Sequence, residues 1–432
     1  MNIRCFSFVS APALSLALVL TGCGATSSHT SSTGGSGNGG SPSGGSGGSP
    51  TSSASEYLYA SAYASGGSIY AWQISSTGTL TPVAGQPFEA NIGNGDQDCT
   101  EGCGTNLAAD PQGRFLYFAY NMNTTSGVDS LGVNASTGAL TAISNVPFYP
   151  GSTANGEITD TGAISVDPSG QYVYGNTEAG SPPGTTLYLF GFSVSSSGQL
   201  TNIAGSPFPM VQGQSGSAIS PGPVAVSQNF VFADFLNQSP TGTLQSWSIG
   251  SNGALTAVAP PAGGIEGTYP PVVTPSGTLV YASFSVNGAG SNQWEIMPYS
   301  IGANGSMTSI PSSAQSLPNE SEPIELFLVS PNGKFLYAFG HNATYAYQIN
   351  GTTGALTPTG TYSNLIAFTA VIDPATKYLY VSPNSGPSSN YVASNNIVGY
   401  QIDSSTGALT AISGDTVTLP QSPVSLAVAG PQ

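Results

Sequence analysis

Apolar and polar positions alternate in short stretches along most of the chain, and turn-forming residues separate these stretches. Residues 69–74 (Ile-Tyr-Ala-Trp-Gln-Ile) and 398–402 (Val-Gly-Tyr-Gln-Ile) show the period of two that is typical of a half-buried β-strand. The 3.6-residue period of an amphipathic helix is absent from residues 56–432. The pattern therefore predicts an all-β domain made of many short strands.

Four predicted strands recur in a fixed order. The first ends at a Pro/Gly turn such as Asp110–Gly113, and the second has an aromatic-aliphatic-aromatic core such as Phe115–Tyr117. The third alternates, and a Thr-Gly turn then leads into the fourth. The turn glycines lie between 49 and 60 residues apart, at Gly78, Gly138, Gly198, Gly253, Gly305, Gly354 and Gly407. Such a repeat predicts the blades of a β-propeller.

The phase of the repeat predicts how the ring closes. The first copy begins at Tyr57 on a second strand, whereas the chain ends in a first strand, Pro423–Val428, without a successor. Together these fragments make one blade and leave no open sheet edge. We therefore expect residues 56–432 to form a monomeric seven-bladed β-propeller, with four antiparallel strands per blade and the C-terminal strand completing the N-terminal blade.

The N-terminus has the features of an export signal. Arg4 precedes an apolar segment, Ala11–Leu20, that is too short to span a bilayer. Leu20-Thr21-Gly22-Cys23 follows and resembles the lipobox of bacterial lipoproteins. This resemblance implies that residues 1–22 are a lipoprotein signal peptide and that Cys23 is lipidated, which would hold the protein to the membrane. An ordinary signal peptide that leaves Cys23 free is the alternative.

The segment after Cys23 is nearly all Gly, Ser, Thr and Pro up to residue 55, which predicts a flexible tether over residues 23–55. Gly24 stands where many lipoproteins of the inner membrane carry aspartate. We therefore expect an exported protein anchored to the cell envelope, at the outer membrane or in the periplasm.

Charge restricts the partners. The chain has twenty Asp and Glu residues, four Lys and Arg residues, and a formal net charge of −16. Nucleic acid is excluded, because binding to phosphates needs clustered cations. Neutral or cationic small molecules, glycans and proteins remain as candidate ligands, although the acidity is also explained by solubility alone.

Residues 56–432 resemble the lactonase family of seven-bladed propellers, which includes 6-phosphogluconolactonase and carboxymuconate cyclase. The resemblance rests on Asp-Pro-x-Gly, Phe-Leu-Tyr, Thr-Gly-Ala-Leu-Thr and the segment Tyr400–Asp403. It implies hydrolysis of anionic lactones by basic and acid/base side chains in the central channel. The domain's strong bases are Arg114, Lys334 and Lys377, and each follows a turn on the rim opposite the variable loops. We therefore expect a binding or scaffold module that has lost phosphosugar chemistry, with an active lactonase as the alternative.

Candidate functional residues lie on the rim that carries the long connections between strands. His341 is the only histidine of the domain, and either Glu322 or Glu325 of the same blade can orient it as a general base. An exposed loop histidine without a catalytic role is the simpler interpretation. Ligand contacts on this rim are expected from Asn106, Asp160, Tyr269 and Gln421. Tyr269 can stack on a sugar ring or pack between blades.

One acidic insertion has its own chemistry. Asp96, Asp98 and Glu101 offer the oxygen ligands that calcium prefers, so calcium is a candidate although no cofactor is required. The insertion lacks the glycine and the closing glutamate of a calcium loop, and a solvated acidic loop is the alternative. Cys99 and Cys103 of the same insertion are expected to form a local disulfide in an exported protein.

Overall fold

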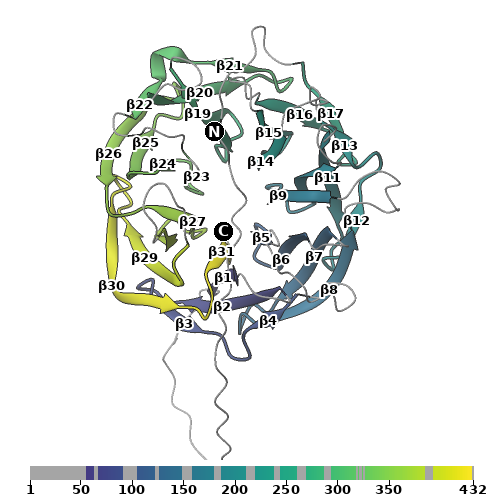
Figure 1. The fold of residues 1–432 in the computed structure, drawn as a ribbon, viewed down its shortest axis with the longest axis vertical. Coiled ribbons are helices and arrows are strands. Elements are labelled where there is room, and N and C mark those ends of the chain that lie inside the picture. Colours follow the sequence, from purple (N-terminus) through teal and green to yellow (C-terminus); the bar gives the residue numbers. More distant parts are fainter. Residues whose placement is uncertain are drawn as a thin grey trace, which may run out of the picture. The chain divides into compact units, whose positions relative to one another are not determined.

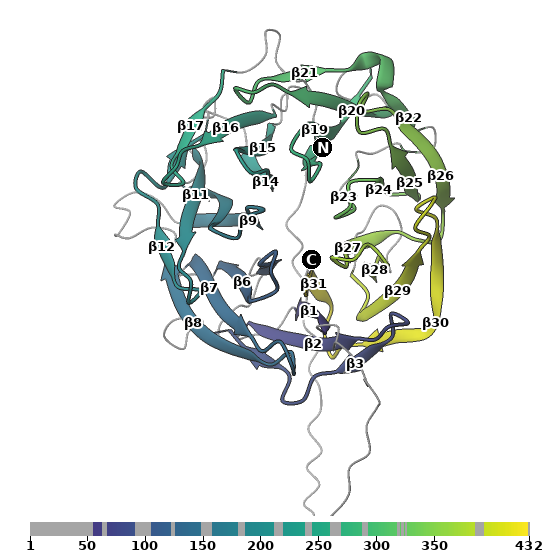
Figure 2. The same cartoon turned by 180° about the vertical axis from the view of Figure 1, so that it is seen from behind.

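Seven antiparallel sheets surround a common axis, and each has four strands on its main path (Figures 1 and 2). This computed structural model confirms the predicted all-β, seven-bladed architecture. It describes residues 55–62, 67–90, 105–121, 126–147, 158–179, 186–210, 219–237, 244–259, 269–286, 293–317, 320, 324, 326–384 and 393–430. All of them belong to one compact unit, Ala54–Gln432.

We number the sheets as blades 1 to 7 and give the strands of each from the axis outward. Blades 1 to 3 each contain four main strands, and blades 1 and 3 also contain one short extra strand. Blade 1 contains β31 (Pro423–Ala429), β1 (Glu56–Ala62), β2 (Ser68–Ile74), β3 (Leu80–Pro82) and the extra β4 (Phe88–Glu89). Blade 2 contains β5 (Thr105–Ala109), β6 (Phe115–Asn121), β7 (Ser126–Val133) and β8 (Leu140–Pro147). Blade 3 contains β9 (Ile158–Val166), β10 (Tyr172–Ala179), β11 (Thr186–Val194), β12 (Leu200–Asn202) and the extra β13 (Phe208–Pro209).

The remaining blades follow the same plan. Blade 4 contains β14 (Ile219–Val226), β15 (Phe230–Asn237), β16 (Gln245–Ile249) and β17 (Leu255–Ala257). Blade 5 contains β18 (Tyr269–Val273), β19 (Leu279–Ser285), β20 (Trp294–Ile301), β21 (Met307–Ser309), the 3-10 helix η2 (Pro311–Ser313) and the extra strand β22 (Gln315–Leu317). Blade 6 contains β23 (Leu326–Val329), β24 (Phe335–Phe339), β25 (Thr344–Ile349) and β26 (Leu356–Tyr362). Blade 7 contains β27 (Ala367–Ile372), β28 (Tyr378–Pro383), β29 (Asn396–Ile402) and β30 (Leu409–Thr418). Among the described residues, no helix has the length and apolar character needed to cross a membrane.

The ring closes in blade 1, as the phase of the repeat predicts. The C-terminal strand β31 pairs antiparallel with β1, from Tyr57 opposite Ala429 to Ala62 opposite Pro423. In Figure 1 the yellow β31 lies beside the purple β1 near the centre of the ring. The first and last strands of the domain thereby share one sheet, and their pairing closes the ring.

Each second strand serves two interfaces between blades. In blade 2, Leu116 and Phe118 pack with Tyr57 of blade 1. The alternate residues Phe115 and Tyr117 pack toward blade 3. Successive side chains of a strand point to opposite faces of its sheet, so one apolar strand fills the core on both sides. This explains why the second strands are continuous apolar runs while the outer strands alternate.

The Thr-Gly turn of each blade packs against the preceding blade. Gly138 has φ +72°, and a Cβ atom there would lie 2.3 Å from the ring of Tyr57. Gly78 has φ +83°, and its Cβ would lie 2.6 Å from the ring of Tyr378. Glycine is therefore required twice at these turns, for the left-handed backbone and for the close approach of an aromatic ring. That ring belongs to the first aromatic residue of the repeated second-strand motif.

A buried hydroxyl group donates a hydrogen bond to the carbonyl of the turn glycine in all seven blades. Six of these glycines face an aromatic ring, and Gly354 faces Leu279 and Pro298 instead. We call the glycine, the side chain that it packs against and the hydroxyl together the blade joint. The hydroxyl bonds are Tyr59 to Gly138 (2.8 Å), Ser130 to Gly198 (2.6 Å), Tyr174 to Gly253 (2.7 Å), Ser246 to Gly305 (2.9 Å), Tyr281 to Gly354 (3.0 Å), Tyr337 to Gly407 (2.8 Å) and Tyr380 to Gly78 (2.7 Å).

Two joints use serine where the other five use tyrosine. Ser246 is the cross-strand partner of Phe232, which occupies the tyrosine position of blade 4 but has no hydroxyl. Ser130 is likewise the partner of Tyr117 in blade 2. The cross-strand partners of the five donating tyrosines have no hydroxyl: Ala71, Gly191, Pro298, Ala346 and Gly399. One of two neighbouring positions therefore supplies the donor in every blade.

Candidate functional site

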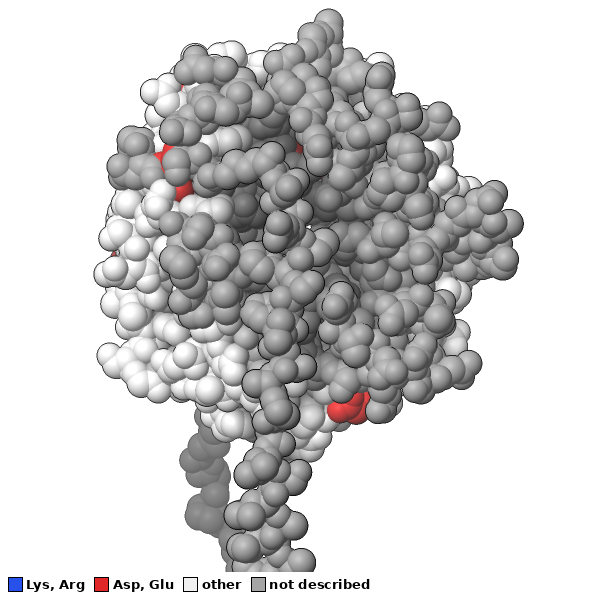
Figure 3. Space-filling model, viewed as in Figure 1, with Lys and Arg blue, Asp and Glu red and all other residues white. Residues whose placement is uncertain are grey.

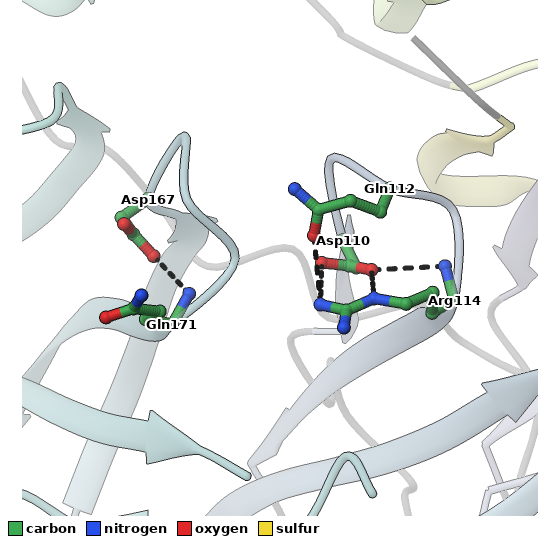
Figure 4. A network of polar contacts seen from close by, with 5 residues as sticks. All are labelled: Asp110, Gln112, Arg114, Asp167 and Gln171. Atoms are coloured by element: carbon green, nitrogen blue, oxygen red, sulfur yellow. Dashed lines mark hydrogen bonds and ion pairs between the residues drawn. The ribbon is translucent and has the colours of Figure 1, made fainter. Parts of the chain in front are cut away.

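Strand order divides the ring into two rims. The turns between first and second strands and between third and fourth strands lie on one rim, which we call the turn rim. The other connections lie on the opposite rim, which we call the loop rim. Side chains stabilise the turns of the turn rim by accepting hydrogen bonds from backbone N–H groups. Asp167, for example, accepts hydrogen bonds from the N–H groups of Gln171 (2.8 Å; Figure 4) and Tyr172 (2.7 Å). These hydrogen bonds stabilise the turns themselves.

All three strong bases of the domain follow turns of the turn rim, as the sequence indicates. Arg114 donates from Nε to Asp110 Oδ2 (2.8 Å) and from Nη2 to Gln112 Oε1 (2.9 Å) (Figure 4). The hydrogen bonds with Asp110 raise the pKa of Arg114. Lys334 and Lys377 occupy the equivalent positions in blades 6 and 7 and are exposed. The positive charge of the domain is therefore confined to the rim opposite the loops.

The strands nearest the axis are almost uncharged. The seven inner strands contain no Lys or Arg, and their only carboxylate is that of Asp160. One face of the ring shows a few carboxylates and no Lys or Arg among its described residues (Figure 3). The inner strands therefore offer a ligand backbone groups, neutral side chains and one acidic residue, but no cation.

The most elaborate polar cluster on the described part of the loop rim surrounds Glu320. Glu320 is 2% exposed, and its carboxylate accepts hydrogen bonds from backbone N–H groups of the hairpin between β24 and β25. The donors are His341 N (3.0 Å), Asn342 N (3.2 Å) and Ala343 N (3.2 Å). Tyr345 adds its hydroxyl at 3.1 Å. Burial raises the pKa of Glu320, and these hydrogen bonds act in the opposite direction.

This cluster sets the position of His341, which is partly exposed on the hairpin. Glycine is needed beside it, because a Cβ on Gly340 would lie 2.5 Å from the Glu320 carboxylate. Glu320 contacts His341 through the backbone N–H. The two carboxylates expected to orient the imidazole, Glu322 and Glu325, lie outside the described residues. The anchoring role of Glu320 has no signal in the sequence, because it stands in a connection that does not repeat.

The expected ligand contacts lie on separate blades. Asn106 Oδ1 accepts a hydrogen bond from Ser425 Oγ (3.4 Å), which links the inner strands β5 and β31. Gln421 is exposed in the turn before β31. Asp160 lies on β9, where its Cα pairs with that of Glu178, and Tyr269 begins β18. Of these four, the structure brings only Asn106 into a described side-chain contact with the closing strand.

The remaining candidates fall outside the described residues. They are Cys23, Asp96, Asp98, Cys99, Glu101 and Cys103. Within the part of the chain that the structure describes, no group of three or more His, Cys, Asp or Glu side chains is arranged to hold a metal ion.

Comparison with known proteins relates the chain to others by fold alone. No protein-family model and no curated protein matches the sequence. A Bacteroides uniformis protein proposed to be a 6-phosphogluconolactonase is 19% identical, with a TM-score of 0.63 over 87% of this chain and 99% of that one. A Bacteroides fragilis protein, also proposed to be a 6-phosphogluconolactonase, is 19% identical, with a TM-score of 0.59 over 88% and 99%. The periplasmic gluconolactonase of Pseudomonas aeruginosa is 15% identical, with a TM-score of 0.58 over 88% and 100%. The chain has the seven-bladed fold of these lactonase-like proteins.

Proposed function

We propose that this protein is an exported, lipid-anchored propeller that binds a neutral or cationic ligand, such as a glycan or a peptide, on its loop rim. In this proposal it keeps the lactonase-like scaffold without phosphosugar chemistry. Cys23 holds it to the envelope, and residues 23–55 tether the propeller.

The distribution of cations carries this proposal. A bound phosphate or carboxylate is normally met by Arg or Lys, often through paired hydrogen bonds. Arg114, Lys334 and Lys377 all lie on the turn rim, and Arg114 is paired with Asp110. The inner strands offer an anion no cationic side chain. A neutral sugar needs only the amide, hydroxyl and carbonyl groups that are present.

Calorimetric titration of the purified protein with neutral oligosaccharides, gluconolactone and 6-phosphogluconolactone tests the proposal. We expect saturable binding of a neutral ligand, weakened by Asn106→Ala, and none of the phosphorylated lactone. Lys334→Ala, on the turn rim, is the matched control and should bind as the wild type does. Binding of 6-phosphogluconolactone that Asn106→Ala abolishes would refute the proposal.

An active lactonase is the second candidate. It is favoured by the shared fold and by the rigid placement of His341 on the loop rim, where Glu320 fixes its backbone. Hydrolysis of neutral and anionic lactones, followed with calcium and with chelator, tests this function. Turnover that is lost in His341→Ala and retained in Lys334→Ala would establish the lactonase.

A further inference from the structure

Blade 1 differs from the other six at one point of the turn rim. Elsewhere a turn joins the first strand to the second, but in blade 1 these strands, β31 and β1, belong to opposite ends of the chain. Glu56 begins β1 at this point. A Cβ atom on Gly430 would lie 2.6 Å from Glu56 Cγ, so the glutamate side chain crosses directly over the end of β31.

A second carboxylate meets Glu56 from blade 7. Asp373 is fully buried, and its Oδ1 accepts the backbone N–H groups of Lys377 (2.6 Å) and Tyr378 (2.5 Å). The backbone N–H of Ala375 also faces this carboxylate. Oδ2 is buried and makes no hydrogen bond of good geometry among the described residues. The side chain of Glu56 lies within hydrogen-bonding reach of Asp373. A protonated Glu56 can donate to this oxygen, whereas an ionised Glu56 would repel it.

We propose that Glu56 and Asp373 share one proton across the junction that closes the ring, so that the contact between the chain ends and blade 7 is sensitive to pH. The buried Oδ2 of Asp373 then receives a well-aligned hydrogen bond from the protonated carboxyl group.

The surrounding charges support this assignment. Burial raises the pKa of Glu56 to about 7, and the negative charge of Asp373 contributes to the rise. Lys377 opposes it from the exposed side of the turn, and burial also raises the pKa of Asp373. Tyr378 is the remaining titratable neighbour, and burial, Asp373 and Glu56 together raise its pKa.

The sign of the pH dependence follows. Glu56 has a higher pKa in the folded protein than the ordinary value of 4.5. The folded state therefore retains the proton after the unfolded chain has lost it. The stabilising contribution of Glu56 is complete below pH 4.5 and is lost as the pH rises through about 7. After allowance for solvent screening of a partly exposed group, this loss changes the unfolding equilibrium constant by roughly tenfold to a hundredfold.

Thermal unfolding of the wild type and of Glu56→Gln at pH 5 and pH 8 tests the proposal. The glutamine amide can donate to Asp373 at either pH, so we expect a higher Tm than the wild type at pH 8 and the same Tm at pH 5. Glu89→Gln, an exposed carboxylate on β4 of the same blade, is the matched control and should leave the pH dependence unchanged. An effect of Glu56→Gln that is equal at both pH values would overturn the proposal.

Two further measurements keep the test decisive. A carboxyl ¹³C titration of Glu56 in the wild-type protein should give a pKa near 7. A pKa near the ordinary value of 4.5 would refute the shared proton, and this result does not depend on whether the variant folds. Calcium chloride at pH 8 should change the Tm of the wild type and of Glu56→Gln by the same amount. A rise in Tm with calcium that Glu56→Gln abolishes would assign the pair to a cation instead.

Discussion

The blade joint predicts that two chemically identical substitutions have different effects. Ser246→Ala removes the only hydroxyl donor at the joint between blades 4 and 5, because Phe232 occupies the neighbouring position. The carbonyl of Gly305 then stays buried without this donor. An acceptor left unsatisfied in this way costs about 1–3 kcal/mol.

Ser130→Ala should cost less. Tyr117 is fully buried, lies beside Ser130 in register, and has a hydroxyl without a hydrogen-bond partner among the described residues. It occupies the position from which tyrosine donates in five other blades, so it can take over the bond to Gly198. The remaining loss is that of one small polar group, below about 1 kcal/mol.

Urea unfolding of both single variants and of Phe232→Tyr/Ser246→Ala measures the difference. The double variant places a tyrosine hydroxyl where the other blades carry one, and should recover about 1 kcal/mol or more relative to Ser246→Ala. Equal free energies of unfolding for Ser246→Ala and Ser130→Ala, together with no recovery in the double variant, would refute the joint as a source of stability.

Three further predictions concern the backbone and the anchor. Thr376 has φ 55°, and its buried hydroxyl accepts a hydrogen bond from Asn332 N–H (3.3 Å). Thr376→Asn should raise the urea midpoint, because asparagine tolerates the left-handed conformation, which costs threonine about 1 kcal/mol, and keeps an acceptor; an unchanged or lower midpoint would contradict this. Gly138→Ala should destabilise by about 1–3 kcal/mol more than Gly354→Ala in the same assay, because the new Cβ lies 2.3 Å from the Tyr57 ring at the first site and 3.0 Å or more from its neighbours at the second. Cys23→Ser should abolish incorporation of labelled palmitate and release the protein from the membrane fraction, whereas labelling that persists would place the lipid elsewhere.

The sequence predicts the blade count and the ring closure because both depend on residues that repeat. Backbone conformation and core packing impose similar residue types in each of the seven blades, and this redundancy makes the pattern visible. Even the donor change in blade 4 leaves a trace, since Phe232 lacks the hydroxyl that its counterparts carry. Its compensation by Ser246 becomes apparent only when the register of β15 and β16 is known.

The candidate site could be predicted only in part, for a physical reason. Glu320 anchors a hairpin that begins twenty residues later, and Glu56 meets Asp373 only because the ring closes. Each contact occurs once and depends on three-dimensional proximity, so no periodic signal marks it. His341 was identifiable by its chemistry, as the only histidine of the domain, but its carboxylate neighbour was not.

The blade joint also determines how much the repeated motifs say about activity. The turn glycine and both aromatic positions of the second strand make contacts between blades, on or near the turn rim. Their presence therefore follows from the need to close a seven-bladed ring, whatever the ring binds. Residues of the inner strands also pack in the cores between blades, as Leu107, Ala427 and Ala370 do. The loop rim lies outside these repeated contacts. The repeated motifs therefore carry no information on activity, and the proposed loss of phosphosugar chemistry rests instead on the seven inner strands, which contain no Lys or Arg.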